Sequence, residues 1–267
     1  MDNYTKNEIL VEAKKIIIQA GKLIREHMEK PYQINTKADR KDLVTEIDEN
    51  TERFMIKQIR NRYPDHQILG EEGTGDNVES LDGTVWIIDP IDGTMNFIHQ
   101  KRFFAISVGI YHNGEGLIGL IYDVMNDTIY EGIKGQGAYK NGKSLPLLSE
   151  DRTLEDSLVG INSFWSVPNR RLNEKKIHQL IRDVRGTRSY GSAALEFAYI
   201  AEGIIDAYIT MRLSPWDIAG GLVIINEVGG IATQVDGRPL DLLRDNTVLV
   251  ANRVIHEDYM KYIEEKK

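Results

Sequence analysis

The 267-residue sequence contains no cysteine. Disulfide bonds, zinc–thiolate sites and thiol nucleophiles are therefore excluded. The six histidines are scattered, and no pair has the spacing of an H-x-x-x-H metal site, which argues against a metal held by imidazole groups. Any metal that this chain binds would have to be held by oxygen ligands.

Basic residues and long apolar runs are also scarce. The sequence has 33 Lys and Arg residues against 41 Asp and Glu, a net charge of -8, which argues against a surface that binds nucleic acid. Its first residues are polar and lack the apolar core of a signal peptide, and no uncharged apolar run is long enough to span a bilayer. We therefore expect a cytoplasmic protein without a membrane anchor, long enough to bury a full core.

Hydrophobic periodicity and turn signals divide the sequence into helices and strands. The segment from Gln33 to Lys41 is charged and is expected to be a mobile connection. Because strands and helices interleave without a simple βαβ alternation, the pattern indicates a mixed α/β (α+β) fold built as a layered sandwich. Helices are expected near 8–28, 45–62, 171–184, 193–203, 217–227 and 254–264, and strands near 66–70, 86–88, 103–111, 117–122, 128–133, 157–161, 204–209, 231–235 and 247–251.

One short stretch combines a buried strand with several chemically active groups. Trp86-Ile87-Ile88 is typical of a covered strand. Pro90 lacks an N–H group and the following Asp-Gly pair favours a turn, so the strand is not expected to continue through these residues. The carboxylates of Asp89 and Asp92 and the hydroxyl of Thr94 would then gather at a strand end. Taken alone, the stretch is compatible with a tight turn and equally with a binding site.

Two further segments place acids at the end of a strand or the start of a helix. Glu71 and Glu72 follow a short strand and enter a glycine-rich turn, and Asp217 begins a helix between Trp216 and the pair Gly220-Gly221. Converging carboxylates repel one another unless they share cations, and oxygen ligands select Mg²⁺. Two such ions roughly 3.5–4 Å apart can activate water and stabilise the leaving oxygen of an in-line displacement.

The stretch from Asp89 to Thr94 suits a site with two ions. Asp89 could bridge both ions, the Ile91 carbonyl could bind one, and Asp92 the other. Thr94 and the N–H groups around Gly93 would then face a phosphate.

Two other features have an ordinary structural interpretation. Asp48 ends the motif Thr45-Glu46-Ile47-Asp48, a loose capping box, which by itself predicts only a helix cap. The small and hydroxyl-bearing residues from Gly186 to Ser192 precede a helix, where they can bind an anion or polyol or serve as N-caps.

Four separated segments of this sequence together resemble the inositol monophosphatase family. This family consists of Mg²⁺-dependent, lithium-sensitive phosphomonoesterases, and motif order, spacing and length agree over essentially the whole chain. The resemblance implies one domain over 1–267, folded as the α-β-α-β-α sandwich that the family shares with fructose-1,6-bisphosphatase. Its metal-binding half would span about 1–145 and its substrate-contributing half about 146–267, and a homodimer is implied. The segments are Asp42-Leu43-Val44-Thr45, Gly70-Glu71-Glu72-Gly73, Trp86 to Phe97, and Trp216-Asp217-Ile218-Ala219-Gly220-Gly221.

The resemblance implies a role for each matching residue. For the metals, two ions and a weaker third are implied, with Li⁺ as an inhibitor. Thr94 paired with Asp48 resembles the dyad that orients and deprotonates the attacking water, a role beyond helix capping. The implied ligands are Glu71, Asp89 and the Ile91 carbonyl for the first ion, Asp89, Asp92 and Asp217 for the second, and Glu72 for water beside the third.

The substrate would be held by other matching positions. Lys37 lies on a segment that matches the mobile loop of the family. Thr210 is a departure, because relatives specific for inositol have a glutamate there, six residues before the Trp-Asp pair, and Arg212 adds a positive charge nearby. The expected substrate contacts are Asp92, Gly93, Thr94, Gly191, Ser192, Ala193, Thr210, Arg212 and Asp217.

The sequence therefore predicts hydrolysis of a small phosphate monoester by activated water, without a covalent phosphoenzyme. Inositol monophosphate is the first candidate substrate, and the loss of the glutamate at Thr210 favours a broader range that includes the 2′-phosphate of NADP. Fructose 1,6-bisphosphate and 3′-phosphoadenosine phosphates are alternatives. A regulatory protein that keeps the fold and binds protein or RNA is the alternative outside enzymes.

Overall fold

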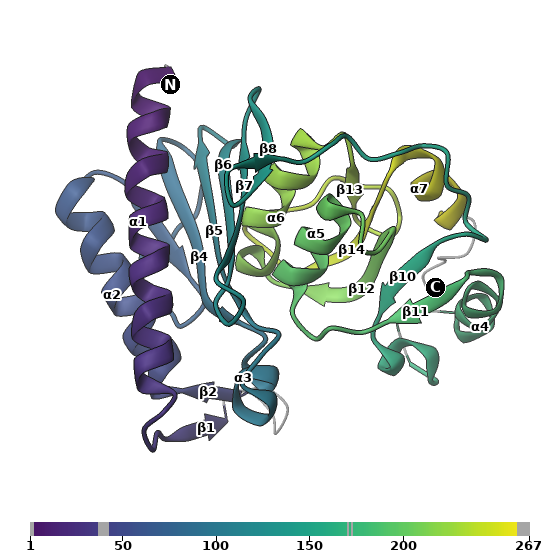
Figure 1. Ribbon diagram of the computed structural model, residues 1–267, viewed down its shortest axis with the longest axis horizontal. Helices are drawn as coiled ribbons and strands as arrows, with labels where there is room; N and C mark the ends of the chain where they lie inside the picture. Colours follow the sequence, from purple (N-terminus) through teal and green to yellow (C-terminus); the bar gives the residue numbers. More distant parts are fainter. Residues whose placement is uncertain (1–2, 37–42, 170, 172, 261–267) are drawn as a thin grey trace.

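The computed structural model describes residues 3–36, 43–169, 171 and 173–260, which form alternating layers of helices and sheets (Figure 1). The helices are α1 (Asn3–His27), α2 (Glu46–Arg62), α3 (Thr94–Gln100), α4 (Glu174–Asp183), α5 (Ala193–Glu202), α6 (Pro215–Glu227) and α7 (Arg253–Tyr259), with a 3-10 turn η1 (Ser163–Ser166). Helices α1 and α2 cover one face of a seven-stranded sheet, and α5 and α6 lie between this sheet and a five-stranded one. Helices α4 and α7 cover the outer face of the second sheet. The predicted α-β-α-β-α sandwich is confirmed.

The seven-stranded sheet occupies the first half of the chain. Its spatial order follows the sequence from β3 to β9, and all neighbours are antiparallel except the parallel pair β3 and β4. Asn113 and Gly114 both have positive φ, 50° and 78°, as a two-residue hairpin of type I′ requires. The strands are β3 (Gln67–Gly70), β4 (Thr84–Asp92), β5 (Ala105–His112), β6 (Glu115–Asp123), β7 (Thr128–Ile133), β8 (Gly137–Lys140) and β9 (Lys143–Ser144).

The expectation that the strand of Trp86-Ile87-Ile88 does not continue through Pro90 was wrong. Strand β4 is buried along its whole length and continues through Asp89 and Pro90 to Asp92. Its pairing with β5 shifts register between Asp89 and Asp92, so Pro90 lies where the ladder is interrupted and its missing N–H costs no regular bond. The bulge therefore keeps both aspartates on one strand.

The five-stranded sheet occupies the second half of the chain. Its order is β11-β10-β12-β14-β13, with β10 parallel to both of its neighbours and the remaining pairs antiparallel. The strands are β10 (Leu158–Ile161), β11 (Gly186–Arg188), β12 (Ala207–Leu213), β13 (Ile231–Thr233) and β14 (Asn246–Ala251).

Part of the segment expected to be a mobile connection is a strand. Strands β1 (Ile34–Thr36) and β2 (Leu43–Thr45) form a small antiparallel pair in which Ile34 lies opposite Thr45. Short strands of this kind are stabilised by their partner rather than by local sequence, so hydrophobic periodicity did not indicate them. No helix in the described ranges is both long and apolar enough to cross a membrane.

Helix α6 rests directly on the seven-stranded sheet because the sheet presents glycines to it. A Cβ atom at Gly119 would lie 2.1 Å from the carbonyl oxygen of Gly220, and one at Gly109 would lie 2.7 Å from Ala219. Any side chain at these positions would push the helix away from the strands. The close contact places the start of α6, which carries Asp217, beside the end of β4.

Candidate active site

Three aspartates from two different elements meet between the layers. Asp89 and Asp92 come from the end of β4, and Asp217 from the first turn of α6. One carboxylate oxygen from each lies within 4.8 Å of the others. The sequence of the stretch from Asp89 to Thr94 was compatible with a tight turn and equally with a binding site. In the structure this stretch contributes two acids to a cluster.

Local hydrogen bonds fix each of these carboxylates. Oδ1 of Asp89 accepts a bond from the Ile91 N–H (2.9 Å), which stabilises the bulge. Oδ2 of Asp92 accepts from the Ala194 N–H (2.7 Å), and Oδ2 of Asp217 accepts from the Ser214 N–H (2.7 Å) in a capping box. Asp217 thus completes the capping box of α6, whose N-cap is Ser214, and also belongs to the cluster. Oδ1 of Asp92 and Oδ1 of Asp217 take no part in these bonds.

The electrostatics of the cluster fit a divalent cation. Burial raises the pKa of Asp89 and Asp217 well above the usual range, and the charges of Glu71 and of the other aspartates raise both further. Burial also raises the pKa of Asp92 to about 6, although its hydrogen bonds from Ser192 and Ala194 oppose the rise. Buried acids that repel one another favour ionisation only when a cation lies among them. An all-oxygen donor set of this kind suits Mg²⁺.

A buried glutamate shapes the loop that carries Glu71 and Glu72. Glu52 lies on α2 and is fully buried. Its Oε2 accepts from the Glu72 N–H (2.7 Å), and its Oε1 accepts from the N–H (3.0 Å) and hydroxyl (2.6 Å) of Thr74. Gly70 leaves room for this contact, because a Cβ there would lie 2.5 Å from Oε2. The sequence analysis missed Glu52, although an acid on the face of Met55, Ile56 and Ile59 was a visible signal.

Asp48 and Thr94 form the pair that the resemblance implied. The Thr94 hydroxyl lies 3.1 Å from Oδ1 of Asp48 and also 3.1 Å from the Ile91 carbonyl oxygen. Oδ2 of Asp48 meanwhile accepts bonds from the N–H (3.0 Å) and hydroxyl of Thr45, which closes the capping box of α2. One oxygen of Asp48 therefore closes the capping box of α2, and the other contacts the Thr94 hydroxyl.

Burial raises the pKa of Asp48 to about 6, against the hydrogen bonds from Thr45 and Thr94 that lower it, and the charge of Glu71 adds to the rise. A carboxylate with a pKa near this value can accept a proton at neutral pH and return it later. The arrangement therefore suits a general base that acts through the Thr94 hydroxyl.

The segment from Gly191 to Ala193 belongs to the second half of the chain and contacts the end of strand β4. Ser192 is the N-cap of α5 and donates its hydroxyl hydrogen to Asp92. Gly93 has φ of +94°, and a Cβ there would lie 3.1 Å from the Gly191 carbonyl oxygen, so only glycine fits comfortably. Asn96, which the sequence analysis did not single out, donates to the carbonyl oxygens of Tyr190 (2.6 Å) and Phe103 (2.8 Å) and ties the same two segments together.

A cavity of about 550 Å³ opens beside the acid cluster. Thr210 is buried in β12 and lines it, and the exposed Arg212 lies at its edge. The predicted substrate residues Asp92, Gly191, Ser192 and Ala193, together with Phe164 and Trp165, line the same cavity. Lys37 lies outside the described residues.

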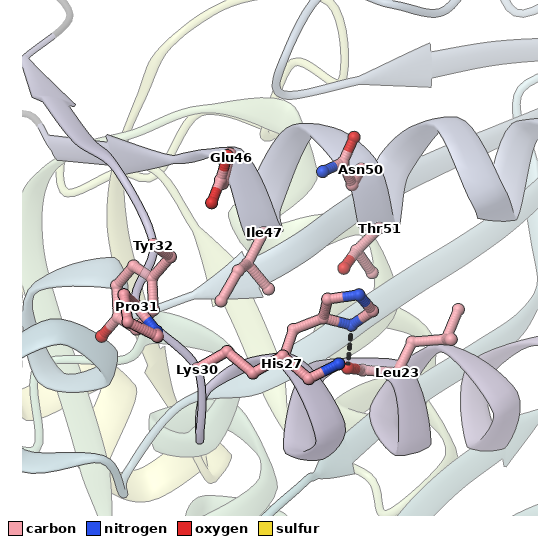
Figure 2. A pocket seen from close by; sticks show the side chains of 9 residues that line it. All are labelled: Leu23, His27, Lys30, Pro31, Tyr32, Glu46, Ile47, Asn50 and Thr51. Carbon is pink, nitrogen blue, oxygen red and sulfur yellow. Dashed lines mark hydrogen bonds between the residues drawn. The ribbon is translucent and has the colours of Figure 1, made fainter.

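A second cavity, of about 380 Å³, lies between the end of α1 and the start of α2. Figure 2 shows its lining side chains, among them His27, whose ring nitrogen Nδ1 lies 2.7 Å from the Leu23 carbonyl oxygen. Its lining includes Ile47, Asn50 and Thr51 but none of the aspartates of the cluster. The acids therefore distinguish the first cavity as the candidate active site.

Comparison with known proteins places this arrangement among phosphatases. A family model described as the inositol monophosphatase family matches residues 5–267. The chain is 52% identical to inositol-1-monophosphatase of Bacillus subtilis over 268 residues, 100% of both chains.

Solved structures agree with the sequence match. A crystal structure of SaIMPase-II with bound 2′-AMP superposes with a TM-score of 0.87 at 42% identity, over 95% of this chain and 93% of that one. A crystal structure of an IMPase/NADP phosphatase with NADP and Ca²⁺ superposes with a TM-score of 0.91 at 25% identity, over 100% of both chains. The similarities therefore extend over both sheets.

Proposed function

Because the chain belongs to the inositol monophosphatase family of phosphomonoesterases, we propose that it hydrolyses small phosphate monoesters with Mg²⁺, inositol monophosphate first among them. The observation that carries the proposal is the meeting of Asp89, Asp92 and Asp217 within 4.8 Å. The bond between Thr94 and Asp48 supports it, because it provides a base for a water molecule at the same place.

The proposed ligand sets are those that the family resemblance implies. Glu71, Asp89 and the Ile91 carbonyl would hold one ion, and Asp89, Asp92 and Asp217 the other, with Glu72 facing water beside a weaker third. Bound Mg²⁺ supplies positive charge that stabilises the phosphoryl oxygens and lowers the pKa of water. Glu52 would hold the loop of Glu71 and Glu72 in place.

Thr94 and Asp48 would take up the proton that the attacking water loses. Thr94 donates its hydroxyl hydrogen to Asp48, which leaves lone pairs on its oxygen to accept a hydrogen bond from the attacking water. As the water oxygen bonds to phosphorus, the bond from phosphorus to the ester oxygen breaks. One water proton passes to Thr94 while the Thr94 proton passes to Asp48, and a second water molecule, which Glu72 would orient, would give a proton to the leaving alcohol oxygen. The N–H groups of Gly93 and Thr94 would orient the phosphate, and the segment from Gly191 to Ala193 would hold the alcohol.

The test of this function is phosphate release from a substrate panel. The panel contains inositol 1-phosphate, NADP, fructose 1,6-bisphosphate and 3′-phosphoadenosine 5′-phosphate. We expect release that requires Mg²⁺, stops with EDTA and falls when Li⁺ is added, with inositol 1-phosphate turned over. Release that persists in EDTA would contradict the proposed metal site, and the order of the four substrates ranks the alternatives.

We further propose that Thr210 and Arg212 broaden the specificity toward the 2′-phosphate of NADP. Thr210 replaces an acceptor carboxylate for polyol hydroxyl groups, and the guanidinium of Arg212 can bind a second phosphate. Thr210→Glu should raise the ratio of kcat/KM for inositol 1-phosphate to that for NADP by about tenfold, the effect of one hydrogen bond to a charged group.

The control for this change is Thr210→Gln, which matches glutamate in size without its charge. Kinetic constants for both substrates in the wild type and the two variants provide the measurement. An unchanged ratio in Thr210→Glu would show that this position does not set the specificity.

A further inference from the structure

A buried serine hydroxyl lies beside the acid cluster without a hydrogen-bond partner. Ser107 lies on β5 and is fully buried, and its Oγ has no partner among the described residues. Burying a hydroxyl group without a partner is unfavourable, and native proteins contain few such groups. The hydroxyl of Ser107 therefore needs an explanation in the working protein.

Strand pairing places Ser107 next to Asp89. The two residues are directly opposite each other on the antiparallel strands β5 and β4, so their side chains lie on the same face of the sheet with Cβ atoms roughly 4.5–5.5 Å apart. Helix α6 covers this face, because a Cβ atom at Gly220 would lie 2.8 Å from the Ser107 Oγ. Gly220 comes about one turn after Asp217 in α6. Ser107 is therefore enclosed between the strand that carries Asp89 and the helix that carries Asp217.

The close packing of α6 explains the small side chain of Ser107 but not its hydroxyl. Gly109 and Tyr111 lie on the same face of β5, and α6 contacts both of them. The Tyr111 hydroxyl donates to the Ala219 carbonyl oxygen (2.9 Å), so a polar group at this interface can have a partner on the helix. Alanine is as small as serine and would leave no unpaired group, so the packing does not require a hydroxyl at this position.

The carboxylate of Asp89 is the neighbouring group that could use a further donor. A carboxylate offers about four lone-pair positions. In the proposed site, two of these positions on Asp89 would face the two ions, and a third accepts the bond from the Ile91 N–H. A donor at the fourth position would fix the orientation of the carboxylate, as hydrogen bonds to metal ligands generally do.

We infer that the Ser107 hydroxyl donates a hydrogen bond to the Asp89 carboxylate when cations are bound at the acid cluster, and that Ser107 is thus a positioning residue for this ligand. The inference rests on the proposed phosphatase function and adds to it a residue that strengthens Mg²⁺ binding. Ser107 acts through Asp89 and contacts neither the substrate nor the attacking water.

The experiment measures the melting temperature of the full chain in EDTA and over a series of Mg²⁺ concentrations, without substrate. Ser107→Ala should raise the apparent Kd for Mg²⁺ about tenfold, because a hydrogen bond to a metal ligand is lost. In EDTA the same variant should melt at or slightly above the temperature of the wild type, because an unpaired buried hydroxyl has been removed. A change that only disturbed the packing would lower the melting temperature in EDTA as well.

Ser157→Ala is the matched control. Ser157 is also fully buried and lies directly before β10, but its hydroxyl donates to the Leu154 carbonyl oxygen. This variant should therefore melt below the wild type in EDTA and keep the wild-type Kd for Mg²⁺, the reverse of the result expected for Ser107→Ala. Ser107→Cys keeps a small side chain with a weaker donor, so its Kd should lie between those of the wild type and Ser107→Ala.

Each other result overturns a distinct statement. An unchanged Kd for Mg²⁺ in Ser107→Ala, or a melting temperature in EDTA well below that of the wild type, would overturn the role of Ser107 and leave the phosphatase function standing. Wild-type protein that Mg²⁺ does not stabilise, and that releases no phosphate from inositol 1-phosphate, would overturn the proposed function itself.

Discussion

Asp89→Asn is expected to abolish phosphate release, lowering kcat/KM about a thousandfold or more. Asp89 is the acid proposed to contact both ions, and losing the charge stabilisation of a bound metal costs several kcal/mol in the transition state. The fold should survive, because the asparagine oxygen can still accept the hydrogen bond from the Ile91 N–H. The measurement is phosphate release together with the melting temperature, each with and without Mg²⁺.

The melting temperature should separate lost metal binding from lost folding. The pKa of Asp89 in the metal-free fold is raised well above its usual value. Its contribution to stability is therefore fully present below the unfolded pKa, about 4, and is lost as the pH rises through the folded pKa. At pH 7 the metal-free variant should thus be at least as stable as the metal-free wild type. Mg²⁺ at a concentration of 100 Kd should raise the free energy of unfolding of the wild type by about 2.7 kcal/mol and should leave that of the variant unchanged.

Two further variants complete this test. Asp217→Asn should behave as Asp89→Asn does, because both belong to the proposed second site. Asp65→Asn is the matched control, since Asp65 is exposed and lies between α2 and β3, apart from the cluster. Near wild-type activity in Asp89→Asn would contradict its assignment as the shared ligand.

Thr94→Val is expected to lower kcat about a hundredfold or more while KM changes little. Valine keeps the shape of threonine but cannot pass a proton from water to Asp48, and a positioned acid or base contributes about 10²- to 10⁴-fold. Thr94→Ser keeps the hydroxyl and should stay within about tenfold of the wild type. Steady-state kinetics on inositol 1-phosphate provides the comparison.

The pH profile of Thr94→Val adds a readout that a purely structural role would not change. The hydrogen bond from Thr94 lowers the pKa of Asp48, which burial raises. Without that bond, the pKa of Asp48 should rise further, and the residual kcat should begin to fall at a higher pH than in the wild type. An acid limb that stays in place, or a serine variant as slow as the valine variant, would remove Asp48 and Thr94 from the proton path.

The metal motif was predictable from sequence because its residues are close in the chain or stand at recognisable ends of elements. Asp89 and Asp92 follow a run of apolar residues, and Asp217 follows Pro215 at the start of a helix. The extension of β4 to Asp92 was not predictable in the same way. It depends on the shifted pairing with β5, a contact between strands that local rules for Pro90 do not describe.

Residues that support the site through hydrogen bonds to its loops were harder to predict from the sequence. Glu52 and Asn96 act on segments 20 and 94 residues away, and no local pattern indicates such partners. The strand pair β1 and β2 depends in the same way on contacts between distant backbones.

The glycines under helix α6 also bear on the order in which the molecule assembles. Asp217 lies close to Asp89 and Asp92 because α6 packs directly on Gly109 and Gly119. When α6 packs on the sheet, three carboxylates that repel one another lose their water. Their repulsion therefore opposes this packing step. We therefore expect dissolved Mg²⁺ to speed the last stage of refolding.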